Sequence, residues 1–149
     1  ILRYELLYRF GGVYMDVDFI VHQPLDVLNH MYEFYACCFP WTLPDTIGNS
    51  MIASIPGHPV LEECFRLING ERSTQDSVLE RTGPFMFQEA VYNILKGRKY
   101  KNDIIFPKSF FYPFDSSSLT DDIKTISDLE KFNRPETFAA HYWAKSWCH

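Results

Sequence analysis

The sequence predicts an α/β domain, because segments with strand periodicity and segments with helix periodicity are intermixed along the chain. Between residues 13 and 20, apolar and polar side chains alternate, as they do along a strand with one buried face. Residues 59–68 instead predict a helix, because Pro59 suits a first helical turn and Asn69-Gly70 suits its end. A length of 149 residues is enough for one domain, so we expect a single domain over residues 1–149.

The other elements follow from the same signals. Leu2, Leu6, Leu7 and Phe10 recur near helical spacing and predict a helix that ends at Gly11-Gly12. Further helices are expected at a short segment after residue 26 and from Thr82-Gly83-Pro84 onward. Residues 71–81 are polar and predict a loop. The remaining expected strands are short and apolar, and they cover residues 34–39, 50–55, 103–106, 110–113 and 137–143.

Composition and charge exclude several classes of protein. Hydrophobic residues make up 46% and charged residues 22%, which is typical of a globular rather than a disordered chain. The formal net charge of −5 comes without a basic stripe, so we expect no nucleic-acid partner. The sequence contains no apolar run near the roughly twenty residues that a membrane span requires. Without a CxxC motif, the four cysteines are expected to be mostly buried, reduced thiols rather than a disulfide framework.

Asp16-Val17-Asp18 is the feature that points most directly to chemistry. On a strand, residues i and i+2 share a face about 7 Å apart, so these two carboxylates would repel each other. A divalent cation relieves that repulsion, and carboxylate oxygens suit magnesium, manganese or calcium better than zinc. The alternative is an exposed edge strand with solvated acids. A D-x-D pattern alone is a weak signal.

The context of these acids resembles a known family. Arg3 and the run from Gly11 to Asp18 resemble the signature of DXD glycosyltransferases with the GT-A fold, in particular glycosyltransferase family 32. Further similar blocks follow in the family's order: Leu25-Asp26, Asn49–Ser54 with Gly57-His58-Pro59, Thr82-Gly83-Pro84, and His141-Tyr142-Trp143 with Ser146-Trp147. The resemblance implies a GT-A-like (Rossmann-like) mixed sheet with flanking helices.

The resemblance also implies an activity. A glycosyltransferase of this kind transfers a hexose from a nucleotide-diphosphate sugar to a glycan, lipid or protein acceptor, with retention of anomeric configuration, as in polysaccharide biosynthesis. Asp18 would be the direct ligand of a manganese (Mn²⁺) or magnesium (Mg²⁺) ion, with Asp16 beside it and in contact with donor hydroxyls, and His141 as a second ligand. Donor-binding roles are further implied for Arg3, Tyr14, Trp143 and Trp147, and weaker acceptor-side roles for Asn49 and Gly83.

Each of these roles has a structural alternative. Arg3 could be a surface helix arginine, Tyr14 and the tryptophans could simply pack, and a lone histidine such as His141 is more often structural. A glycoside hydrolase also needs two carboxylates, but these flank the scissile bond from opposite sides, which neighbours on one strand do not. The other rival is a non-catalytic fragment that binds metal or nucleotide sugar weakly.

The chain begins at Ile1, inside an expected helix without a capping residue, so we expect a catalytic-domain fragment that is incomplete at the N-terminus. Membrane association would then come through a missing N-terminal segment. An anchor helix there would indicate the Golgi lumen, and its absence a membrane-associated enzyme of the bacterial cytoplasm.

Overall fold

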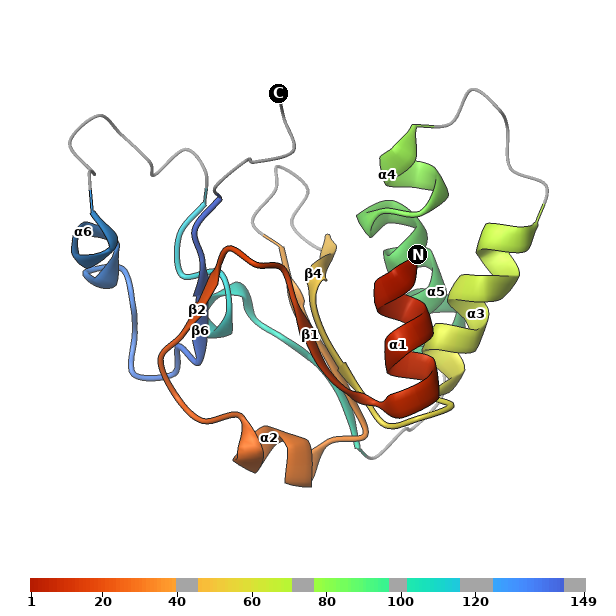
Figure 1. The fold of residues 1–149 in the computed structure, drawn as a ribbon, viewed down its shortest axis with the longest axis horizontal. Coiled ribbons are helices and arrows are strands. Elements are labelled where there is room, and N and C mark those ends of the chain that lie inside the picture. Colours follow the sequence, from red (N-terminus) through yellow and green to blue (C-terminus); the bar gives the residue numbers. More distant parts are fainter. Residues whose placement is uncertain (40–45, 71–76, 97–101, 116–124, 144–149) are drawn as a thin grey trace.

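The computed structural model describes residues 1–39, 46–70, 77–96, 102–115 and 125–143. Its main sheet has four strands in the order β1-β4-β3-β5 (Figure 1). The bounds of these strands are β1 Gly12–Met15, β3 Phe34–Cys38, β4 Ile47–Ser54 and β5 Asp103–Phe106. β4 runs antiparallel to both β1 and β3, whereas β5 is parallel to β3. A separate antiparallel pair consists of β2 (Phe19–Val21) and β6 (Ala139–His141).

Helices flank the main sheet, and this mixed α/β architecture confirms the predicted fold class. In Figure 1, one group of helices lies to the right of the sheet, while the β2-β6 pair and α6 lie to its left. The right-hand group is α1 (Leu2–Phe10), α3 (Pro59–Asn69), α4 (Val78–Arg81) and α5 (Pro84–Leu95). The other helical segments are α2 (Asp26–Met31), the 3₁₀ turn η1 (Lys108–Phe110) and α6 (Ile126–Glu130).

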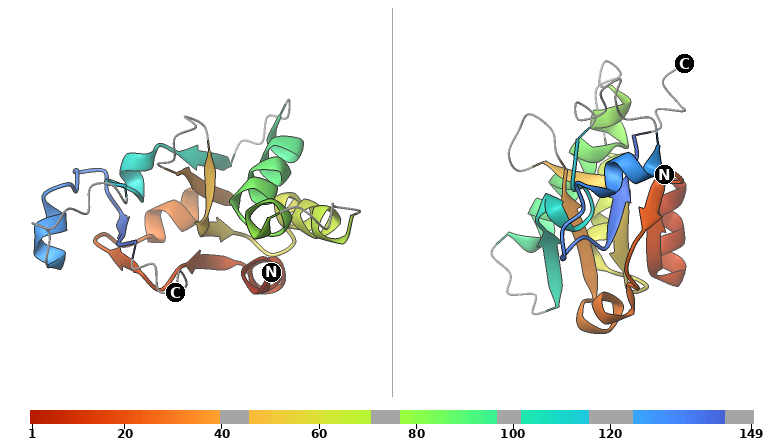
Figure 2. Two further views of the ribbon diagram at one scale, coloured as in Figure 1. Left: turned by 90° about the horizontal axis from the view of Figure 1, so that it is seen from above. Right: turned by 90° about the vertical axis from the view of Figure 1, so that its left-hand side faces the viewer.

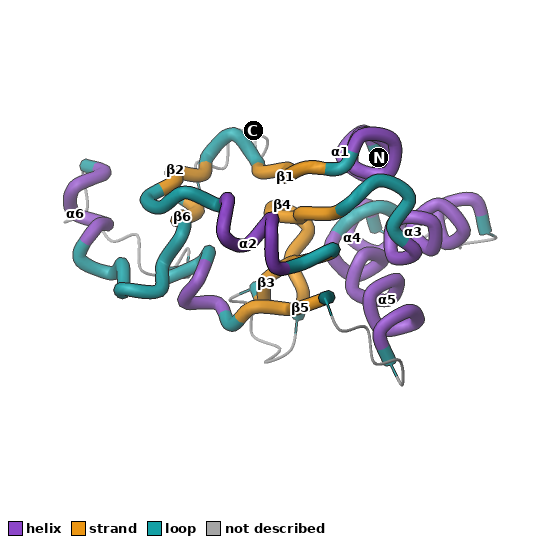
Figure 3. Tube along the Cα trace, turned by 90° about the horizontal axis from the view of Figure 1, so that it is seen from below, coloured by secondary structure: helices purple, strands orange, loops and turns teal. Residues whose placement is uncertain are grey.

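Two further views give the depth of the molecule. Seen from above, α1, β1 and β2 lie along one side, and α5 and β5 lie along the other (Figure 2). The view from below shows the strands of the main sheet side by side in the order β1, β4, β3, β5 (Figure 3). β1 is therefore an edge strand of the main sheet, and the chain continues from it directly into the second sheet.

The core occupies both faces of the main sheet. Along β3, Phe34 and Ala36 pack into one cluster with α3 and α5, whereas Tyr35 and Cys37 pack into a second cluster on the opposite face. All four side chains are fully or almost fully buried. A strand that is covered on both faces has no polar side, which explains why residues 34–39 are a continuous apolar run in the sequence.

The expected strand over residues 13–20 is interrupted, which corrects the prediction. β1 ends at Met15, and the chain then turns, with the Phe19 N–H donating to the Asp16 carbonyl at 3.2 Å. Val17 is at the tip of this turn with its side chain 99% exposed. Strands disfavour aspartate and turns favour it, so the two acids end the strand rather than extend it.

The helix over residues 2–10 is confirmed, but its expected buried face is only partly right. Leu7 is buried together with Tyr4, while Leu2 and Phe10 are 70% and 74% exposed. Apolar side chains occur on two sides of this helix, so periodicity alone does not identify the buried one. Gly11 ends the helix with φ 66, and a Cβ there would lie 2.9 Å from the Ser54 carbonyl oxygen, so the close approach to β4 requires glycine.

The remaining differences between the predicted and the observed elements are small and have local causes. Part of the expected loop over 71–81 is the helix α4, which begins with a capping box between Ser77 and Glu80, and residues 71–76 lie outside the described part. The strand predicted over 110–113 is instead the end of η1 and a turn. Cys37, Cys38 and Cys64 are not in disulfide bonds, and Cys148 lies outside the described residues. None of the described helices has the length and apolar character needed to cross a membrane.

Candidate active site

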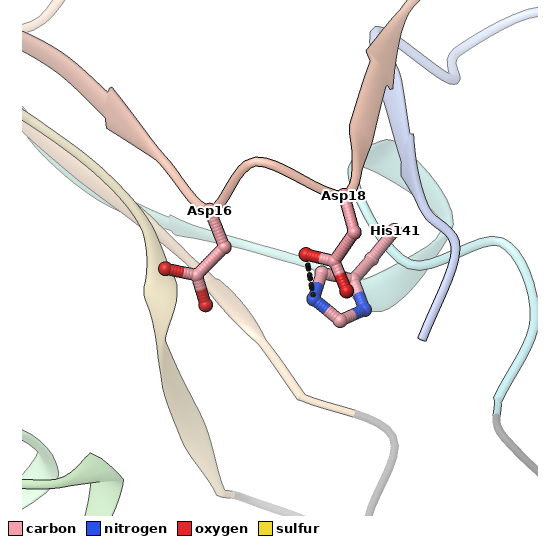
Figure 4. A group of neighbouring side chains, drawn as sticks. All are labelled: Asp16, Asp18 and His141. Carbon is pink, nitrogen blue, oxygen red and sulfur yellow. Dashed lines mark ion pairs between the residues drawn. The ribbon is translucent and has the colours of Figure 1, made fainter. Parts of the chain in front are cut away.

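Asp16, Asp18 and His141 converge on one point (Figure 4). One ligand atom from each of the three lies within 4.8 Å of the others. Asp16 directly follows β1, Asp18 directly precedes β2, and His141 is on β6, where it pairs with Phe19. The three residues therefore come from the end of the main sheet and from the second sheet, and together they form a group that can hold a divalent metal ion.

Asp18 and His141 form the tightest contact of the group, with 3.2 Å between Oδ1 and Nε2. The His141 side chain is 9% exposed and that of Asp18 is 15% exposed. Burial lowers the pKa of His141, although the nearby carboxylates of Asp18 and Asp16 act in the opposite direction. The imidazole is therefore neutral at neutral pH, which is the form that ligates metals.

Asp16 is held by two neighbours. The Tyr14 hydroxyl donates to Asp16 Oδ1 at 2.7 Å, and Arg3 Nη1 is 3.3 Å from the same oxygen. The Arg3 guanidinium also lies over the Tyr14 ring, 4.5 Å from its centroid. Burial and the hydrogen bond to Asp16 raise the pKa of Tyr14 to about 12, so the phenol stays protonated and remains a donor. The structure thus brings three of the predicted donor-binding residues together.

Asn49 joins this group through its backbone. Arg3 Nη1 donates to the Asn49 carbonyl at 2.6 Å, and the Asn49 amide donates to the Tyr4 hydroxyl at 2.8 Å. The Tyr4 hydroxyl in turn donates to the Thr82 carbonyl at 3.1 Å, next to Gly83. A Cβ at Gly83 would lie 2.6 Å from the Leu79 Cα, so this glycine allows α4 and α5 to meet. The acceptor-side roles of Asn49 and Gly83 stay predictions.

Trp143 lies beside the group formed by Asp16, Asp18 and His141. Its ring packs against His141 with 4.5 Å between centroids, and its backbone N–H donates to His141 Nδ1 at 3.3 Å. The ring also contacts Phe39 at 5.1 Å. These contacts are compatible with packing, and stacking on a sugar or base stays a prediction. Trp147 lies outside the described residues.

Ser50 and Tyr112 lie beneath the site, and sequence reasoning missed both of them. The Asp16 N–H donates to the Ser50 carbonyl at 2.8 Å, and Ser50 Oγ is 2.7 Å from the Tyr112 hydroxyl. Ser50 lies within the Asn49–Ser54 block but was given no role, and Tyr112 falls in a segment that was predicted to be a short strand. Only the three-dimensional structure brings them under the acidic pair.

Comparisons with known proteins show what this chain is similar to. Residues 1–35 match the family described as "Glycosyltransferase sugar-binding region containing DXD motif". Inositol phosphoceramide mannosyltransferase 1 of Schizosaccharomyces pombe is 28% identical, over 97% of this chain and 39% of the relative. Inositol phosphoceramide mannosyltransferase 2 of the same organism is 24% identical, over 99% of this chain and 38% of the relative.

Two further matches cover less of the chain. Inositol phosphoceramide mannosyltransferase 3 of the same organism is 35% identical over 44% of this chain and 17% of the relative. The solved structure of "PaToxG Glycosyltransferase" superposes on 64% of this chain and 34% of its own, with a TM-score of 0.49 and 23% identity. The chain thus spans 17% to 39% of the three curated relatives. The match to the DXD region and the relatives that align along nearly all of its length make this chain similar to the DXD-type glycosyltransferases.

Proposed function

We propose that the protein transfers a hexose from a nucleotide-diphosphate sugar to an acceptor, and that it does so with a divalent cation held by Asp16, Asp18 and His141. The observation that carries this proposal is the convergence of two carboxylates and one neutral imidazole within 4.8 Å. Carboxylates suit magnesium and manganese, whereas imidazole suits transition metals. The mixed set of ligands therefore supports Mn²⁺ over Mg²⁺.

The chain's own residues have distinct tasks in this proposal. Asp18 and His141 are both largely buried and would supply two fixed ligand atoms. Arg3 and Tyr14 orient Asp16 through the contacts to its Oδ1. The remaining N–H groups of the Arg3 fork can bind phosphate or sugar oxygens. When bound, the cation would neutralise the charge that develops on the departing diphosphate.

The names of the relatives suggest which substrates to test first. Three of them are inositol phosphoceramide mannosyltransferases, which supports nucleotide-activated mannose as the donor and a lipid of the inositol phosphoceramide type as the acceptor. Retention of anomeric configuration is proposed on the family resemblance. A hydrolase is disfavoured, because Asp16 and Asp18 belong to one turn and cannot flank a glycosidic bond from opposite sides.

The proposal is tested with the full-length protein, a panel of UDP- and GDP-sugars, and inositol phosphoceramide as the first acceptor. Transfer is measured by mass spectrometry of the product, with Mn²⁺ present, after addition of excess EDTA, and after Mn²⁺ is restored. We expect transfer with one donor, its loss with EDTA and its recovery with Mn²⁺. Transfer that continues unchanged in EDTA would contradict the role of the metal, and hydrolysis of a glycoside under both conditions would favour the hydrolase.

A further inference from the structure

We propose that Tyr112 is a positioning residue of the metal-binding site. Its side chain sets the spacing between Asp16 on one side of the site and Asp18 and His141 on the other. The inference rests on the proposed function of that site. It concerns a residue that touches neither the cation nor the donor, and that acts through the groups that do.

The site needs such a residue because it spans two sheets. Asp16 is fixed to the main sheet, where it follows β1, whereas Asp18 and His141 belong to the β2-β6 pair. Within the described residues, no strand of one sheet pairs with a strand of the other. The turn between Asp16 and Phe19 links the two sheets along the chain, and Val17 at its tip is exposed and adds no packing contact that would fix their spacing. The spacing of the ligands therefore depends on the packing underneath.

Tyr112 is fastened to the main sheet through its hydroxyl. The side chain is 0% exposed, and its hydroxyl is 2.7 Å from Ser50 Oγ on β4. The carbonyl of the same Ser50 accepts the Asp16 N–H at 2.8 Å. One residue of β4 thus holds both the Tyr112 side chain and the backbone of the first acid.

The ring of Tyr112 supports the other half of the site. It meets the Phe19 ring edge-on at 5.6 Å between centroids and the His141 ring at 5.8 Å. Phe19 directly follows Asp18, and its own ring packs against His141 at 4.8 Å. The position of the Tyr112 ring is thereby coupled to the strand that carries Asp18 and to the imidazole.

Gly48 leaves room for the Tyr112 hydroxyl. A Cβ at Gly48 would lie 2.9 Å from the hydroxyl oxygen, so glycine at that position leaves room for it.

The test compares Tyr112→Phe with a matched control, Tyr35→Phe, in the full-length protein. Tyr35 is 1% exposed and lies in the same core cluster, but its hydroxyl donates to Asn29 of α2 at 2.8 Å instead of reaching the site. Both variants lose one buried hydroxyl and should be destabilised by similar amounts in urea. Mn²⁺ affinity is measured by isothermal titration calorimetry at a temperature where all variants are folded. We expect only Tyr112→Phe to bind Mn²⁺ more weakly, by about tenfold.

Ser50→Ala is a second test of the inference, because it removes the other partner of the hydrogen bond between Ser50 and Tyr112. We expect it to weaken Mn²⁺ binding as Tyr112→Phe does, and we expect the double variant to lose no more than either single one. Unchanged Mn²⁺ affinity in Tyr112→Phe, or an equal loss of Mn²⁺ affinity in Tyr35→Phe, would overturn the inference about Tyr112 and leave the proposed metal site in place. Failure of the unmodified protein to bind Mn²⁺ would overturn the metal site and this inference together.

Discussion

Asp18 Oδ1 and His141 Nε2 lie 3.2 Å apart, although the two residues stand near opposite ends of the chain. The contact is made because β2 and β6 pair antiparallel, with Phe19 opposite His141, and the Tyr142 N–H donates to the Asp18 carbonyl at 2.8 Å. The pairing brings a carboxylate next to a buried imidazole whose pKa burial lowers. An acid and a neutral imidazole in this arrangement would form one side of the proposed metal-binding site.

His141→Ala removes the imidazole and leaves both acids in place. We expect the affinity for Mn²⁺ to fall by at least about tenfold, because loss of a ligand costs no less than loss of a supporting residue. The affinity is measured by isothermal titration calorimetry. His30→Ala, which changes an exposed histidine on α2, is the control and should bind Mn²⁺ as the unmodified protein does. Equal affinities for all three proteins would show that His141 is not a ligand.

Arg3→Lys keeps the positive charge and removes the planar fork. Arg3 contacts the Asn49 carbonyl, Asp16 and the Tyr14 ring at once, and the single ammonium of lysine cannot do so. We expect kcat/KM for the donor to fall by about tenfold or more, equivalent to about 1.4 kcal/mol, while the free energy of unfolding changes little. Arg9→Lys on the same helix, where the exposed side chain pairs with the partly exposed Glu5, should leave kcat/KM unchanged. Parallel losses in both variants would contradict the assignment.

The buried His58 predicts how stability depends on pH. Its Nδ1 accepts the Val60 N–H, its Nε2 is 3.3 Å from Asp103, and its ring stacks on Phe34. Burial lowers the pKa of His58 below its ordinary value, although Asp103 and, more weakly, Glu33 act in the opposite direction. The unfolded chain thus takes up a proton near pH 6.5 that the folded chain takes up only at lower pH, so the free energy of unfolding falls as the pH drops below about 6.5.

Urea unfolding of the unmodified protein and of His58→Gln, at intervals from pH 7.5 to pH 5.5, measures this effect. The slope attributable to one histidine is at most about 1.4 kcal/mol per pH unit. We expect the variant to be less stable at every pH but to have a shallower slope than the unmodified protein. His141 also has a lowered pKa, so some slope should remain. An identical slope in both proteins would mean that His58 is not neutral in the fold.

Much of the site is predictable from the sequence, but the reason for its geometry is not. Asp16, Asp18 and His141 were expected to meet, and they do, yet the expected route was wrong. The two acids lie at either end of a turn and not two positions apart on a continuous strand. Alternation of apolar and polar residues continues through the turn, so periodicity could not reveal the break.

The remaining differences arise from long-range packing. The buried face of α1 depends on which side the sheet and α3 occupy, and its sequence is apolar on both sides. Ser50 and Tyr112 support the site only because β4 and the segment after η1 meet beneath it. Contacts of this kind join positions far apart in the chain, and a single sequence carries no local signal for them.

Mn²⁺ binding to the unmodified full-length protein and to Asp18→Asn tests the central claim most directly. Asparagine keeps the shape of the side chain and removes its charge, and Glu62→Gln on α3 controls for the same change of charge at an exposed position. We predict that the unmodified protein and Glu62→Gln bind one Mn²⁺ with equal affinity, and that Asp18→Asn binds it at least about tenfold more weakly while unfolding at a similar urea concentration. Equal Mn²⁺ affinity for the unmodified protein and Asp18→Asn would contradict the proposed metal site.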